Sequence, residues 1–175
     1  MKNYYSITSY NLSNFKYWLL ISFVFILSTT KGISQVNSYT FSESLVGYTP
    51  LVGGTVAYAA PWDNETSAQV TLPFSFTYNY NPVTQFYISA NGFISFGAIQ
   101  PVATNYLPMQ TATAHTGVVS ALGTNLVSNG SDIVYDVIGV APNRTMVVQW
   151  TNAVRAASGG DFNFQIRLNG NHCSS

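Results

Sequence analysis

The sequence has very little charge. Asp, Glu, Lys and Arg together make up 7% of its 175 residues, against about a quarter in ordinary soluble domains. All three lysines lie within the first 34 residues, and beyond them three arginines stand against six carboxylates, so that part carries a net charge of 3 − 6 = −3. Because binding to phosphates relies on clustered Lys and Arg, nucleic acid is not expected as a partner.

Cysteine and histidine are almost absent as well. A single cysteine, Cys173, excludes a disulfide within the chain, so the fold must be held together by packing. Only His115 and His172 could serve as an imidazole base beside a nucleophile. With no convergent set of titratable groups in view, we expect no enzymatic activity and no catalytic residue.

Hydrophobic runs long enough to cross a membrane are also missing. The apolar run over residues 17–27 is shorter than the roughly 20 residues that span a bilayer. Lys2 and Lys16 precede this run, and the small residues Gly32 and Ser34 follow it. This order predicts a helical signal peptide over residues 1–34, cleaved before Gln35, with an uncleaved membrane anchor as the alternative. We therefore expect an extracellular or cell-surface protein that contacts the membrane only through its export signal.

The rest of the chain has the alternation of β-strands. Apolar residues recur at every second position, and no window shows the three-and-four spacing of an amphipathic helix. The sequence predicts an all-β domain over residues 35–168, an antiparallel β-sandwich of the jelly-roll or lectin-like kind with about nine short strands. We expect residues 99–116 to be an irregular connection between the two sheets, and residues 118–122 to be a central strand covered on both sides.

Aromatic and aliphatic residues alternate with polar ones most clearly over residues 86–97, and this pattern predicts a β-hairpin around Asn91-Gly92. A two-residue loop would mix apolar and polar side chains on each face. A three-residue loop, with Gly92 in a left-handed conformation, instead pairs Ile88 with Ile94 and Phe86 with Phe96. We favour this second register because it makes one face wholly apolar, and each large buried group contributes about 2 kcal/mol.

Several stretches together resemble a known family: residues 88–97, 133–135, 139–144, 147–150 and 164–168. They look like a β-sandwich domain of secreted surface proteins of the Bacteroidetes type, similar to cargo of type IX secretion and distantly to nidogen-like extracellular modules. The resemblance implies a non-enzymatic interaction or adhesion module. That family normally continues with another strand after the position of Leu168, so residues 169–175 are interpreted as an unstructured tail of a truncated or frame-shifted copy.

The carboxylates offer weak candidates for a metal site. Asp132 and Asp136 are four apart on an expected strand and face the same way, and Asp63 and Glu65 supply oxygens close together in sequence. Calcium is the ion that such groups would bind. The alternative, which we favour, is that all four are solvated, because calcium takes six to eight oxygens and no dense ligand loop is present. No cofactor is therefore expected.

Aromatic residues in predicted loops are the candidates for ligand binding, namely Trp62, Tyr80 and Tyr106. Exposed rings could stack on sugars or anchor a protein partner. The alternative is that they cap the core. The sequence thus predicts an interaction or adhesion module for a protein or glycan partner, with a carbohydrate-binding module of a secreted hydrolase-type protein as the competing function.

Overall fold

The computed structural model describes residues 42–108 and 117–170. These residues form nine β-strands and no helix, which confirms the predicted antiparallel β-sandwich. All nine strands belong to one compact unit that begins at Ser44. The strands are β1 (Thr55–Tyr58), β2 (Val70–Tyr78), β3 (Asn81–Ser89), β4 (Phe93–Ser95), β5 (Val118–Ser120), β6 (Leu126–Ser128), β7 (Ile133–Val140), β8 (Asn143–Arg155) and β9 (Asp161–Gly170).

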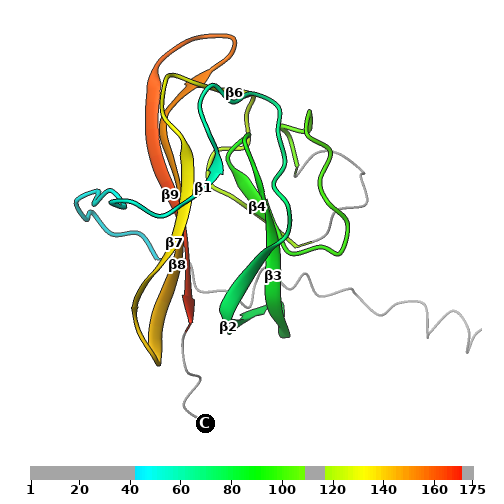
Figure 1. Ribbon diagram of the computed structural model, residues 1–175, viewed down its shortest axis with the longest axis vertical. Coiled ribbons are helices and arrows are strands. Elements are labelled where there is room, and N and C mark those ends of the chain that lie inside the picture. Colours follow the sequence, from blue (N-terminus) through cyan, green and yellow to red (C-terminus); the bar gives the residue numbers. More distant parts are fainter. Residues whose placement is uncertain (1–41, 109–116, 171–175) are drawn as a thin grey trace, which may run out of the picture. The chain divides into compact units, whose positions relative to one another are not determined.

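The strands form two layers (Figure 1). One sheet has the order β2-β3-β4-β5. The other is built around β8, which is 13 residues long. Strand β9 pairs with one edge of β8 along most of the length of β8. The other edge of β8 pairs with β7 at residues 143–150 of β8 and with β6 at residues 153–155 of β8. Strand β1 adds to β7.

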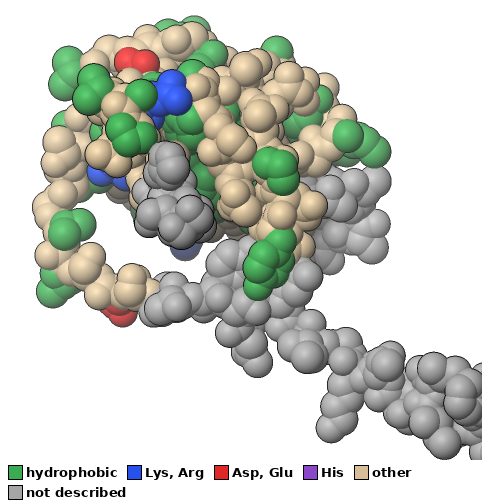
Figure 2. Space-filling model, turned by 90° about the horizontal axis from the view of Figure 1, so that it is seen from below, with side chains coloured by type: hydrophobic (Ala, Val, Ile, Leu, Met, Phe, Trp, Pro, Cys, Tyr) green, Lys and Arg blue, Asp and Glu red, His purple; other side chains and the backbone are tan. Residues whose placement is uncertain are grey.

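The surface is as poor in charge as the composition requires. On the face shown in Figure 2, hydrophobic and neutral polar side chains predominate and charged side chains are few. The predicted signal peptide over residues 1–34 lies outside the described residues. Within the described ranges, no helix is long and apolar enough to cross a bilayer.

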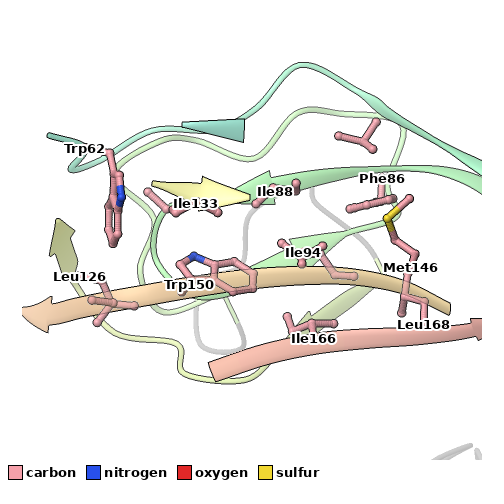
Figure 3. Packing of buried hydrophobic residues seen from close by; sticks show 14 of the residues in the cluster. Trp62, Phe86, Ile88, Ile94, Leu126, Ile133, Met146, Trp150, Ile166 and Leu168 are labelled. Carbon is pink, nitrogen blue, oxygen red and sulfur yellow. The ribbon is translucent and has the colours of Figure 1, made fainter. Parts of the chain in front are cut away.

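The core lies between the two sheets and is made of the alternate residues that the period-two pattern predicted (Figure 3). Trp150 of β8 is fully buried near its centre and stacks on Phe164 of β9, with 5.0 Å between ring centroids. Its indole N–H donates to the carbonyl of Ser89 on the opposite sheet at 3.3 Å. The hydroxyl of Tyr58 donates to the neighbouring carbonyl of Ile88 at 2.9 Å. Two polar side chains thus join the sheets through adjacent carbonyls of β3.

The hairpin of β3 and β4 has the predicted three-residue register. Ile88 pairs with Ile94, and Gly92 has a φ of +81°. Strand β4 ends at Ser95, however, so the expected pair of Phe86 with Phe96 is not part of the ladder. The N–H of Phe96 instead donates to the carbonyl of Gly117, at 2.9 Å.

The loop of this hairpin is buried rather than exposed. Asn91 is fully buried, and its amide nitrogen donates to the carbonyl of Ala103 at 3.2 Å and to Oδ1 of Asn64 at 3.3 Å. Its Oδ1 accepts the N–H of Leu126 at 3.0 Å. The carbonyl of Gly92 accepts the N–H groups of residues 121 and 122. Three segments distant in sequence are therefore fastened to one turn.

Three expectations about the connections and strands are wrong. The segment after β4 is irregular over its described part, residues 99–108, but the strands that it joins, β4 and β5, are neighbours in one sheet. Strand β5 is a half-buried edge strand, not a covered central one. The segment returns to the same sheet, with the carbonyl of Ala103 bonded to Asn91 of the hairpin, and β5 then pairs only with β4 among the described strands, which makes it an edge strand. Strand β9 also continues to Gly170, past the expected end at Leu168.

A short strap, residues 49–51, lies across the outer face of the five-stranded sheet. The Oε1 of Gln149 accepts the N–H of Leu51 at 2.6 Å, and Nε2 of Gln165 donates to the carbonyl of Thr49 at 3.0 Å. The two glutamine side chains also bond to each other at 2.7 Å. The two amides therefore hold the strap against the face of the sheet.

Replacing Gly92 with alanine tests the tight turn. A Cβ at this residue would lie 2.5 Å from the carbonyl oxygen of Leu122, whereas a Cβ at Gly130, which has the same φ of +81°, would meet nothing within 4 Å. Gly130→Ala should cost about 1 kcal/mol of unfolding free energy for its left-handed backbone. Gly92→Ala should cost at least about 2 kcal/mol more, or prevent folding. Chemical denaturation measures both, and equal losses would contradict the close packing.

The pH dependence of stability tests the bond from Tyr58. Burial first, and then the charge of Glu65, raise the pKa of the Tyr58 hydroxyl well above its ordinary value of 10. The unfolded state ionises near pH 10 while the folded state keeps its proton, so stability is complete below pH 10 and falls above it, by up to about 1.4 kcal/mol per pH unit. Tyr58→Phe should be less stable at pH 7 and lose less between pH 10 and 12. An unchanged slope would contradict this.

Candidate functional site

The hairpin of β2 and β3 presents an aromatic ring at its tip. Tyr78 pairs with Asn81, so Asn79 and Tyr80 form a two-residue loop, with φ angles of +50° and +62°. Such loops need left-handed residues, which Asn adopts readily and a bulky residue does not. Tyr80 nevertheless occupies this loop, with 72% of its surface exposed. The strain is about 1–2 kcal/mol, and strained residues concentrate at functional positions.

A small aromatic cluster lies next to this loop. The ring of Phe96 stacks on Phe76 with 5.6 Å between centroids, and it tilts against Tyr78 at 5.0 Å. All three side chains are only half-buried. The hydroxyl of Tyr78 donates to the carbonyl of Val118 at 3.4 Å, which ties the loop end to β5. The cluster is therefore fixed by both edges of the four-stranded sheet while its rings remain partly accessible.

A hollow of about 240 Å³ opens beside these rings. Figure 2 views the molecule from this end. Two aromatic rings and a valine form its apolar part, and two amide side chains add hydrogen-bonding groups. No charged residue lines it among those that the structure describes. The hollow is lined by Tyr78, Asn79, Asn81, Val83, Phe96 and Gly117.

Chemically, the described lining residues offer aromatic rings and amides for binding, and no His, Cys, Asp, Glu or Lys side chain is among them. Rings pack against apolar or sugar surfaces, and amides both donate and accept hydrogen bonds. A flat, neutral, partly apolar partner fits such a surface best. We define the aromatic end as Tyr80 together with the hollow and the three clustered rings.

The structure places the three predicted aromatic residues in different surroundings. Tyr80 belongs to the aromatic end. Trp62 is only 2% exposed, and its indole N–H donates to the carbonyl of Ser131 at 2.7 Å, so the core-capping alternative describes it. Its ring has no free face for a ligand. Tyr106 is 42% exposed on the segment between β4 and β5 and does not line the hollow.

The four carboxylates named as calcium candidates serve local roles or face solvent. Asp132 accepts the N–H of Ala60 at 2.7 Å, and Asp136 accepts that of Val137 at 2.7 Å. Asp63 and Glu65 are exposed. Over residues 42–108 and 117–170, no three His, Cys, Asp or Glu side chains come together as a metal site. The favoured expectation that these carboxylates bind no calcium stays a prediction, with calcium binding as its alternative, and the two histidines and Cys173 lie outside the described residues.

Sequence reasoning missed most of the aromatic end. We expected Phe96 to be a core partner of Phe86, and no binding role was predicted for Asn79 or Asn81. One signal was available: a tight Asn-Tyr loop between two alternating strands puts tyrosine where glycine is usual. The tilt of Phe96 onto Tyr78 carries no such signal, because it depends on where β4 ends.

Comparison with known proteins assigns this architecture to a family. The family model described as NIDO related matches residues 38–172, which includes all nine strands. No curated protein and no solved structure is significantly similar to the chain. Proteins with nidogen-like domains are typically extracellular, which agrees with the neutral, charge-poor composition. The chain therefore belongs to the NIDO-related family of nidogen-like extracellular domains.

Proposed function

We propose that this chain is a secreted or cell-surface module that mediates adhesion by binding another protein, without catalysing a reaction. The observation that carries the proposal is Tyr80, an exposed ring held in a strained loop beside an uncharged hollow. Membership of the NIDO-related family supports an interaction role outside the cell.

The aromatic end suits a protein partner for a physical reason. A tyrosine ring buries a large area on binding and loses few rotatable bonds, so such rings are frequent anchors at interfaces. At Tyr80 the tight loop fixes the backbone before the partner arrives, which lowers the entropy cost further. The half-buried rings of Phe76 and Phe96 extend the apolar surface next to this anchor.

A glycan is the second candidate ligand. One observation favours it: the hollow combines the rings of Tyr78 and Phe96 with the amides of Asn79 and Asn81. Rings can stack on the apolar face of a sugar, and amides can bond to its hydroxyl groups. The absence of charge among the described lining residues suits a neutral sugar. In this case the chain would be a carbohydrate-binding module.

The proposal includes an origin and an export route. We infer a surface protein of the Bacteroidetes type, exported by type IX secretion after cleavage of a signal peptide over residues 1–34. The motifs over residues 88–97 and 147–150 support this origin through the resemblance that they carry. The proposal of a non-enzymatic role is supported by the lack, in the described ranges, of any group of three His, Cys, Asp or Glu side chains that could hold a metal ion.

Tyr80→Gly separates binding from folding. Glycine adopts the left-handed loop without strain, so this variant should be more stable than the parent by about 1 kcal/mol in chemical denaturation. It should bind at least about tenfold more weakly to immobilised matrix proteins or cells, because the anchoring ring is lost. A gain in stability with a loss of binding cannot be attributed to unfolding.

Tyr106→Ala is the matched control, because it removes an exposed ring that does not line the hollow. This variant should keep its binding. Binding of the parent to a glycan panel that disappears in Tyr80→Gly would instead favour the carbohydrate-binding candidate. If adhesion and glycan binding are both unaffected by Tyr80→Gly, the aromatic end is not the binding site.

A further inference from the structure

The two sheets of the described residues have five free edges, formed by β1, β2, β5, β6 and β9. An exposed edge strand invites pairing with another chain, and proteins usually blunt it by shortness, proline or a bulge. Four of the five edges here are blunted in this way. Strands β5 and β6 have three residues each, β1 has four with a register shift, and β2 contains Pro73 and a register shift of its own.

Strand β9 is the exception. It has ten residues, contains no proline and pairs only with β8 among the strands of the described ranges. The β8–β9 ladder does contain a bulge, but the extra residue lies on β8, where Thr151 and Asn152 both oppose Asn163. Asn152 takes up the distortion with a φ of +49°, and its N–H bonds to Oδ1 of Asn163. The outer edge of β9 therefore stays regular.

The sequence of this edge is complementary to itself. In an antiparallel pair centred on Phe164, Asp161 of one copy lies opposite Arg167 of the other, and the reverse contact forms at the same time. Phe162 then lies opposite Ile166. Both side chains of the charge pair are exposed on the outer face, whereas the aromatic and aliphatic residues share the core face. The pairing thus matches charge with charge and continues each face of the sheet.

We propose that two copies of this chain associate through β9, in antiparallel register about Phe164, so that their five-stranded sheets form one continuous sheet. We infer that the partner of this edge is a second copy of the chain, because a twofold pair places Asp161 opposite Arg167 at two symmetric positions. The interaction does not involve the aromatic end, so it does not depend on the proposed function. It would place two binding ends on one particle, and paired ends strengthen attachment to a surface.

Charge reversal tests both the partner and the register. Purified protein should dimerise reversibly in sedimentation velocity over a concentration series. Asp161→Arg and Arg167→Asp each place like charges opposite one another at two symmetric positions, and each should weaken the dimer about tenfold or more. The double variant restores opposite charges and should return to within about threefold of the parent dissociation constant. The Asn129 bond to Asp161 is on the exposed surface, so the fold should survive.

Asp63→Arg is the control, since it makes the same charge change as Asp161→Arg at an exposed residue that lies outside every strand. The dissociation constant of this variant should equal that of the parent. Circular dichroism verifies that each variant is folded. A parent that stays monomeric overturns the proposal, as does a double variant that fails to recover. Hydrogen exchange gives a second readout, because the β9 N–H groups that point away from β8 should gain protection as the concentration rises. If these groups are already protected at the lowest concentration, another part of the same chain covers the edge and the proposal is overturned.

Discussion

The sandwich depends on a buried turn that holds three segments distant in sequence in place. Hairpin loops normally lie at the surface, but the loop at Asn91-Gly92 is enclosed, and its polar groups must find partners inside the protein. The amide of Asn91 supplies them by bonding to three segments distant in sequence. Gly92 permits this because a Cβ there would collide with the carbonyl of Leu122. The irregular segments are therefore positioned by one amide side chain and one missing Cβ.

The anchored turn at one end of β3 supports the exposed loop at Tyr80 at the other end. Strand β3 runs from the exposed loop at Tyr80 to the buried Asn91, and Tyr58 and Trp150 hold its last carbonyls against the other sheet. A strand anchored so firmly can support a strained residue at its far end, because the strain is small beside the packing of the core. The exposed ring is thus presented by a fixed scaffold rather than by a mobile loop.

The sequence predicted the parts of the fold that follow from local chemistry. Alternation of large apolar residues gave the strands, and the need to keep one face apolar selected the register that pairs Ile88 with Ile94. Core capping by Trp62 was among the sequence-based alternatives and is confirmed, whereas the edge position of β5 could not be predicted, because it depends on which strand the chain pairs with after the irregular segment. Tyr80 was named as a candidate, but the rings around it come together only through tertiary packing, so the site as a whole was not predictable.

Hydrogen exchange at single amides tests the role of the buried turn most directly. The N–H groups of Ala121, Leu122 and Leu126 lie outside the long strands of the sheets, yet they bond to Gly92 or Asn91. If the turn organises the structure, these three amides should exchange only by global unfolding, with the same free energy as the N–H of Trp150 in the core. Exchange by local opening, at a free energy several kcal/mol below the global value, would contradict the central claim.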